Sequence, residues 1–168
     1  MKFLSYEMFE ENAKKDRQWK SYKQRWLYHE KAIELLRKMN LPAESPVLEI
    51  GSFGANIVMG SDLMDMPLGE WPVPEETLKY VYDARQLPWP IADKQYDVLI
   101  ALRVWHHLSP VQEQCFMEAK RVSQRILLVC PEQEMVGKGI AKSDFISWNG
   151  APPLYMEDLG AWGVLYLF

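Results

Sequence analysis

The sequence predicts an α/β fold built on a mostly parallel sheet. Its first two-thirds contain four apolar runs of strand length, and a fifth run follows a helical stretch. These runs cover residues 47–50, 57–61, 79–82, 97–102 and 125–130. An acidic residue lies at or near the end of each of the first three runs: Glu49, Asp62 and Asp83. Because open α/β sheets bind ligands at the carboxyl ends of their strands, we expect a site at that edge.

The N-terminal region, from about Ser5 to Met39, predicts one long helix or two shorter ones. Large apolar and aromatic side chains recur there every three or four residues, so they share one helical face. That face includes Trp26, His29, Ile33 and Leu36. The helix would either pack this face on the sheet or cap the ligand pocket, with Lys23 and Arg25 facing an acidic substrate. We expect His29 to be a core histidine.

The first strand carries an acid within an apolar run. Val47, Leu48 and Ile50 predict a buried strand, and Gly51 allows a sharp turn and the close approach of a ligand. Glu49 would be costly to bury unless a cation or a hydrogen-bond donor lies against it. It therefore marks either a binding site or a paired structural charge.

The connection to the second strand is short. Only six residues separate Ile50 from Ile57, whereas a parallel crossover normally takes a dozen or more. We expect a bare loop in place of a crossover helix. The alternative is a helix over residues 56–64, with no second strand.

The fourth strand leads into a histidine-containing turn and a helix. His106 and His107 follow Arg103, and histidine titrates near neutral pH, so either imidazole would serve as a general base or would support the loop. Ser109 predicts the N-cap of the next helix, with Gln112 completing a capping box. Near the C-terminus, residues 144–148 and 163–168 predict an antiparallel strand pair, and residues 149–155 predict a loop that would act as a substrate lid.

Composition narrows the class of protein. The 168 residues are 48% hydrophobic, which is enough for a real core, and the net charge of -4 argues against general affinity for nucleic acid. Nine basic and three acidic residues between Lys14 and Lys38 make that segment locally positive. Two cysteines are too few for a disulfide framework, and neither a signal peptide nor a membrane span is evident. We expect a cytoplasmic protein, with no membrane partner and no metal.

The series of strand ends resembles the class I S-adenosylmethionine-dependent methyltransferases. The similar segments read VLEIGSFGA, SDLMD, YDARQLPWP, YDVLIALRVWHHL and RILLVCPE, and they extend over residues 46–132. The resemblance implies a reduced Rossmann-like sheet, mostly parallel with a C-terminal antiparallel strand pair. It also implies a single domain, in which residues 1–41 form a helical cap and residues 46–168 form the α/β core.

The same resemblance implies a cofactor and the residues that would bind it. S-adenosylmethionine would place its ribose hydroxyls on Asp62, with Asp65 as the competing candidate, and its adenine on Asp83 and Ala84. The remaining cofactor contacts would be Glu49, Gly51, Ser52, Leu63 and Arg103. His106 is the candidate catalytic residue. Phe53 departs from the family pattern, because small turn residues are usual in that loop.

The expected function is therefore methyl transfer to an unidentified acceptor, either a small molecule or a surface-exposed group. Positioning supplies most of the acceleration of such a displacement, so no dedicated acid or base is required. The alternative is a catalytically inactive methyltransferase-like module for binding or assembly. A third hypothesis, which uses the basic N-terminal helix, is an enzyme that acts on nucleic acid.

Overall fold

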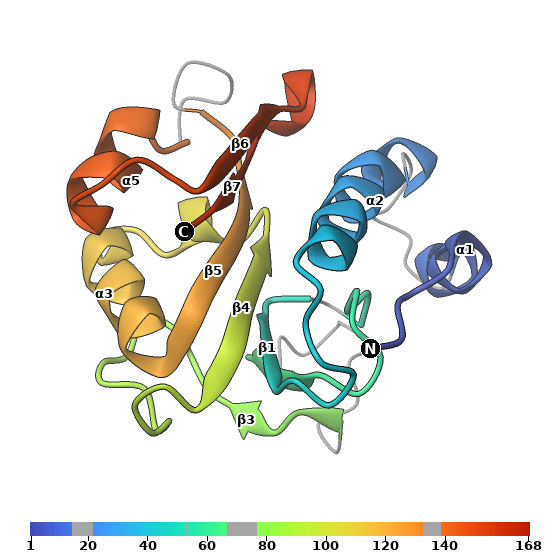
Figure 1. Ribbon diagram of the computed structural model, residues 1–168, viewed down its shortest axis with the longest axis horizontal. Helices are drawn as coiled ribbons and strands as arrows, with labels where there is room; N and C mark the ends of the chain where they lie inside the picture. Colours follow the sequence, from blue (N-terminus) through green and yellow to red (C-terminus); the bar gives the residue numbers. More distant parts are fainter. Residues whose placement is uncertain (15–21, 53, 67–76, 133–138) are drawn as a thin grey trace.

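The computed structural model describes every residue except 15–21, 53, 67–76 and 133–138, and it shows one sheet between two layers of helices (Figure 1). The helices are α1 (Tyr6–Lys14), α2 (Tyr22–Lys38), α3 (Gln112–Val122) and α5 (Lys142–Asn149), with short 3-10 helices η2 (Trp105–His107) and η3 (Gly160–Trp162). The strands are β1 (Val47–Ile50), β2 (Asp62–Asp65), β3 (Tyr80–Val81), β4 (Tyr96–Leu102), β5 (Ser123–Cys130), β6 (Tyr155–Asp158) and β7 (Val164–Leu167).

The seven strands lie in the order β3-β2-β1-β4-β5-β7-β6. The first five strands in this order, from β3 to β5, are parallel to one another. The strand β7 pairs antiparallel with both β5 and β6. This confirms the predicted mostly parallel sheet with C-terminal antiparallel strands. The carboxyl ends of β1, β2 and β4 consequently share one edge of the sheet.

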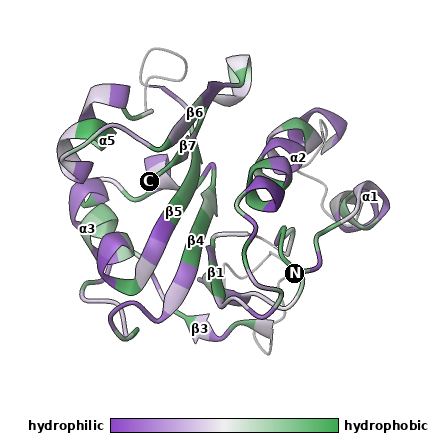
Figure 2. Cartoon of the chain, viewed as in Figure 1, coloured by the Kyte–Doolittle hydropathy of each residue, from purple (hydrophilic) through white to green (hydrophobic). Residues whose placement is uncertain are grey.

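Both faces of the central strands are buried. Along β4, Val98 and Ile100 pack with α2, whereas Leu99 and Ala101 pack with α3 and α5 on the other face. Figure 2 shows the resulting apolar stretches in β4 and β5. Burial on both faces explains why these strands are nearly continuous apolar runs in the sequence.

The second strand does not lie where the sequence predicts it. β2 covers Asp62–Asp65, and its register pairs Leu48 with Asp62 and Ile50 with Met64. No helix occurs among the described residues between Gly51 and Ser61, so the bare loop is confirmed there, and the alternative of a helix over residues 56–64 is wrong. Phe53 itself lies outside the part of the chain that the structure describes.

The N-terminal segment explains why residues 57–61 are apolar without belonging to the sheet. Phe3 forms an antiparallel bridge with Val58, and the Leu4 N–H donates to the Ile57 carbonyl at 3.0 Å. Leu4 and Phe9 then pack against Ala55. The start of the chain therefore covers the crossover loop, which buries Ile57 and Val58 outside the sheet.

The predicted helix cap at Ser109 is also wrong. α3 begins at Gln112 after Val111, which is its N-cap residue and makes no side-chain capping bond. Ser109 lies within a turn, which is closed by a hydrogen bond of 3.0 Å from the Val111 N–H to the Leu108 carbonyl. Cys115 nevertheless lies in the buried stripe of α3, as its spacing predicts.

The C-terminal region contains one strand that the sequence misplaces. Residues 144–148 belong to helix α5, in which Phe145 is buried against Phe116 and Trp148. Gly150 ends the helix with a φ of 76°, and its N–H bonds to the last-turn carbonyls, as is usual for a left-handed helix C-cap. The strand that precedes β7 and pairs with it is β6, not residues 144–148. β6 begins at Tyr155, which is the last residue of the predicted lid.

Among the described residues, no helix combines the length and the apolar content that crossing a bilayer requires.

The packing of α1 on the crossover loop can be tested at Phe9. This side chain is fully buried, with ring centroids 5.3 Å from Trp26 and 4.8 Å from His29. Phe9→Ala removes a buried ring and should lower the free energy of unfolding by about 3 to 5 kcal/mol in urea denaturation. Glu11→Ala, on the exposed side of α1, is the matched control and should change it little. Equal, small effects would show that the packing of α1 against α2 and the crossover loop does not stabilise the fold.

Candidate functional site

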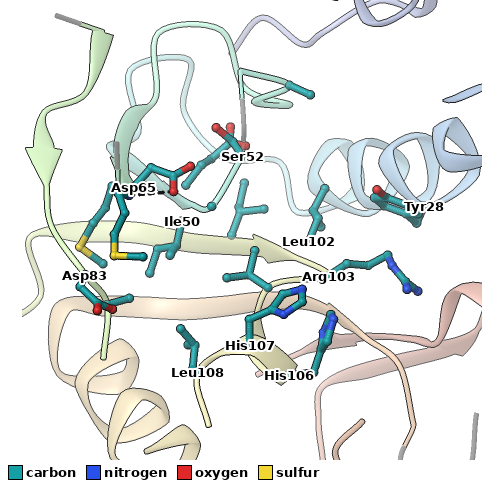
Figure 3. A pocket seen from close by; sticks show the side chains of 18 of the residues that line it. Tyr28, Ile50, Ser52, Asp65, Asp83, Leu102, Arg103, His106, His107 and Leu108 are labelled. Carbon is teal, nitrogen blue, oxygen red and sulfur yellow. Dashed lines mark hydrogen bonds between the residues drawn. The ribbon is translucent and has the colours of Figure 1, made fainter. Parts of the chain in front are cut away.

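A cavity of about 650 Å³ opens at the carboxyl edge of the sheet (Figure 3). It is bounded by the ends of β1, β2 and β4, by the residues after β3, and by α2, η2 and η3. This volume lies within the range typical of small-molecule sites. In the view of Figure 3, Asp65 and Asp83 lie on one side, and Tyr28 and Arg103 on the opposite side.

Glu49 is a buried carboxylate that holds the crossover loop. It is 2% exposed, and it accepts hydrogen bonds from the Ile57 N–H (2.9 Å), the Val58 N–H (2.8 Å) and the Ser61 hydroxyl (3.0 Å). Burial raises the pKa of Glu49 to about 7, because desolvation outweighs these three hydrogen bonds. Glu49 also contributes to the cavity wall. The sequence leaves open whether Glu49 marks a binding site or a structural charge. Its hydrogen bonds show the structural role, because they hold the crossover loop.

The glycine turn after β1 leaves no room for a side chain. Gly51 has a φ of 64°, and a Cβ at this position would lie 2.7 Å from Cγ2 of Val104. Its N–H donates to the Met64 carbonyl at 3.1 Å, which fixes the turn against the end of β2. Gly51 and Ser52 both line the cavity, where the sequence predicts them.

The two acids of β2 lie at opposite ends of the strand. Asp65 ends β2 and lines the cavity, whereas Asp62 begins the strand and lies away from it. The carboxylate of Asp62 binds Lys79 and also accepts a hydrogen bond from the Tyr96 hydroxyl at 2.7 Å. The prediction that Asp62 follows the second strand is therefore wrong, because the strand starts at this residue. Leu63 is buried within the sheet and does not line the cavity.

Asp83 and Ala84 lie beside the cavity after β3, as the sequence predicts. The Asp83 carboxylate is held by Arg85 through Nε at 3.0 Å and Nη2 at 2.8 Å, and this partner lowers the pKa of Asp83. The Ala84 carbonyl accepts a hydrogen bond from the Trp89 indole at 2.8 Å. The loop after β3 is thus fixed to the protein core.

Arg103 follows β4 in a backbone conformation that is uncommon for a residue with a side chain, with a φ of 60°. Its Nη1 donates to the Trp162 carbonyl at 2.6 Å, and its guanidinium lies 5.4 Å from the centroid of the Trp162 ring. Burial lowers the pKa of Arg103, and the nearby charge of Arg25 lowers it further. Arg103 therefore joins the end of β4 to the β6–β7 connection.

His106 and His107 both line the cavity on η2, with ring centroids 3.9 Å apart. Burial lowers the pKa of His106 to about 4, with further contributions from the charges of His107 and Arg103. Its Nδ1 is buried and has no hydrogen-bond partner among the described residues. The imidazole of His106 is thus neutral at physiological pH.

Helix α2 packs on the sheet and also lines the cavity, so packing on the sheet does not exclude a place for this helix at the pocket. Ile33 and Leu36 pack on the sheet, whereas Arg25, Tyr28 and His29 line the cavity. His29 is fully buried, and its pKa falls to about 4 through desolvation. Its Nδ1 lies 3.0 Å from the Arg25 carbonyl, which agrees with a core histidine.

Some cavity residues carry no clear signal in the sequence. Trp162 comes from a 3-10 helix far along the chain, and only the pairing of β7 with β5 brings it to the end of β4. Tyr28 belongs to the aromatic N-terminal segment, and its position next to His29 is the one signal that marks it. Met64 and Met66 flank Asp65 and follow from the corrected position of β2.

Metal binding and cysteine chemistry find no support in the described part of the chain. Within it, no three His, Cys, Asp or Glu side chains gather in a way that would hold a metal ion. Cys115 and Cys130 are buried, which raises the pKa of each thiol to about 12 and makes both poor nucleophiles.

Comparison with known proteins identifies the fold. No protein-family model and no curated protein matches the sequence. A chain from the complex between the Haloferax volcanii Trm112 methyltransferase activator and a protein classed as a methyltransferase is similar, with a TM-score of 0.63, 11% identity and coverage of 95% of this chain and 93% of that chain.

Two further solved structures point to the same fold. A SAM-dependent methyltransferase of Thermotoga maritima, described as a possible histamine N-methyltransferase, has a TM-score of 0.58 and 12% identity, covering 97% of this chain and 98% of its own. A SAM-dependent methyltransferase of Aquifex aeolicus has a TM-score of 0.52 and 14% identity, covering 81% and 88%. The chain therefore has the fold of class I S-adenosylmethionine-dependent methyltransferases.

The raised pKa of Glu49 makes a prediction about stability. The folded protein keeps the proton up to about pH 7, whereas the unfolded chain releases it near 4.5, so folding is favoured at low pH and loses stability as pH rises through this window. The stability of the wild type relative to Glu49→Gln should fall by roughly 2 to 3 kcal/mol between pH 5 and pH 8 in urea denaturation. Because His29 and His106 titrate in both proteins, their contribution cancels. A stability difference that does not change with pH, or that rises, would contradict the assigned pKa.

Proposed function

We propose that this protein binds S-adenosylmethionine in the cavity and transfers its methyl group to an acceptor. The observation that carries this proposal is the placement of Asp65 and Asp83 on one cavity, at the carboxyl edge of a sheet with the methyltransferase fold. Ligands of open α/β sheets bind at this edge, where polar residues follow each strand.

Asp65 takes the role that the sequence suggests for Asp62. An ionised carboxylate only accepts hydrogen bonds and has two oxygens, so it can accept both hydroxyls of a ribose. Asp65 lies at the end of β2 for this task, and its Oδ1 accepts the Met66 N–H at 2.9 Å, which orients the side chain. Asp83 and Ala84 would bind the adenine on the neighbouring side of the cavity, with Arg85 orienting the Asp83 carboxylate.

The β1 turn fits the remainder of the cofactor. Gly51 lets the backbone lie close to a ligand, and Ser52 offers a hydroxyl on the cavity wall. The buried carboxylate of Glu49 keeps the 57–61 loop in place, so we assign it a supporting role at this site. Loss of the crossover helix matters little here, because S-adenosylmethionine has no phosphate for a helix N-terminus to bind.

Methyl transfer depends more on the positioning of the two reactants than on acid–base catalysis. The cofactor supplies a methyl group on a positively charged sulfur, and attack by the acceptor forms the new bond as the carbon–sulfur bond breaks. The protein's task is to orient the acceptor in line and to exclude water. Tyr28 of α2 and Trp162 of η3 cover the cavity for this purpose. His106 contributes to the cavity wall on η2, and its imidazole is neutral at physiological pH.

A binding or assembly module without methyl transfer is the second candidate. The crossover loop contains no helix among its described residues, and the Asp83 carboxylate is engaged by Arg85. The similar Haloferax volcanii chain was solved with a methyltransferase activator, so a protein partner of this chain would fit either candidate. Failure of the wild type to bind the cofactor or its product would favour it over the enzyme.

Calorimetry with S-adenosylhomocysteine tests the enzyme proposal. The wild type should bind with a micromolar dissociation constant, which corresponds to roughly -7 to -8 kcal/mol. Asp65→Ala removes the charged partner of the ribose, and a hydrogen bond to a charged group is worth ~1.5 to 3 kcal/mol, so affinity should fall about ten- to a hundredfold.

Asp62→Ala is the matched control, because this acid belongs to the same strand but lies outside the cavity. It should leave the affinity for S-adenosylhomocysteine nearly unchanged, with folding checked by thermal unfolding. A larger loss of affinity in Asp62→Ala than in Asp65→Ala would refute the assignment of the ribose to Asp65.

A further inference from the structure

The charged side chains of the cavity are divided between its two sides. Asp65 and Asp83 lie on one side, where Arg85 is paired with Asp83. Arg103 lies on the opposite side at the end of β4, close enough to Arg25 of α2 to be affected by its charge. The cofactor sites assigned to Asp65 and Asp83 occupy the acidic side. The basic side is therefore the part of the cavity that remains for a second ligand.

Arg103 lacks a negative partner at the basic side. Among the described residues, no carboxylate forms an ion pair with its guanidinium, which instead contacts the Trp162 carbonyl and ring. Burial and the charge of Arg25 both disfavour the charged form of Arg103. Within the described part of the chain, the guanidinium makes one hydrogen bond, through Nη1, so its other N–H groups remain for an anion that would offset the cost of burying the charge.

The walls around Arg103 are aromatic. The Tyr28 and Trp162 rings lie 5.7 Å apart, and the guanidinium faces the Trp162 ring. His106 lines the same cavity, next to His107, and its Nδ1 is enclosed by protein atoms. The basic side thus offers a charged fork, flat apolar walls and one neutral imidazole.

We propose that the methyl acceptor is a small apolar molecule with a carboxylate, and that Arg103 binds this carboxylate and determines the choice of acceptor. This proposal rests on the proposed methyl transfer. A guanidinium matches the planar geometry of a carboxylate, and its hydrogen bond to Trp162 fixes its orientation. Tyr28 and Trp162 contact the apolar body of the acceptor, and His106 completes the wall on this side of the cavity.

The probe for this site is benzoate, compared with its neutral isostere benzamide. Each is titrated into the protein saturated with S-adenosylhomocysteine and followed by NMR. The wild type should bind benzoate about tenfold more tightly than benzamide, because the charged pair is absent with the amide. Arg103→Gln should abolish this preference, while the Gln amide can still donate to the Trp162 carbonyl. Lys23→Met removes an exposed cation from α2, two residues before Arg25, and should keep the preference.

A second arm excludes the cofactor's own carboxylate as the partner of Arg103. S-adenosylhomocysteine carries this group, whereas 5′-methylthioadenosine lacks the whole amino-acid end. Arg103→Gln should leave the affinity for both ligands unchanged. A tenfold loss for S-adenosylhomocysteine alone would place Arg103 in the cofactor site, as the sequence suggests, and would overturn the proposal.

The remaining outcomes are also decisive. Equal binding of benzoate and benzamide to the wild type overturns the proposal without any variant, so the test survives if Arg103→Gln fails to fold. Tighter binding of phenyl phosphate than of benzoate would assign the site to a phosphate instead. If neither S-adenosylhomocysteine nor 5′-methylthioadenosine binds the wild type, the proposed methyl transfer fails. Benzoate and benzamide are then titrated into the free protein, and a preference for benzoate that Arg103→Gln abolishes would keep the carboxylate site and remove only its role in methyl transfer.

Discussion

The carboxylate of Glu49 fixes the part of the fold on which the site depends. It accepts the N–H groups of Ile57 and Val58 and the hydroxyl of Ser61, and these bonds hold the crossover loop against β1. β2 begins directly after this loop, so the position of the loop sets the register that brings Asp65 to the cavity. A buried acid is costly to ionise, and the three donors offset this cost only in part, so the pKa of Glu49 stays raised.

The N-terminal segment completes this arrangement from outside. Phe3 bridges to Val58, and Leu4 and Phe9 cover Ala55, so the loop is buried between the start of the chain and β1. Helix α2 then reaches over the sheet and contributes Tyr28 to the cavity. The same region therefore stabilises a crossover without a helix in its described residues and closes the candidate site.

The sequence predicts best those elements that are buried on both faces. Residues 98–102 and 126–130 are continuously apolar because helices cover both sides of β4 and β5. The run at 57–61 is similarly apolar, but its apolar residues are covered by the N-terminal segment, which local patterning does not reveal. Glu49, within β1, and Asp83, after β3, line the cavity at the predicted edge of the sheet, whereas the prediction for Asp62 depends on the misplaced second strand. Trp162 approaches Arg103 through long-range pairing of β7, for which the local sequence holds no signal.

A crystal structure of the protein with S-adenosylhomocysteine would show directly where the cofactor binds. We expect the ribose hydroxyls to contact the Asp65 carboxylate, with the adenine beside Asp83 and Ala84 and the basic side of the cavity left for the acceptor. A ribose bound to Asp62, or a ligand outside the cavity, would contradict this expectation.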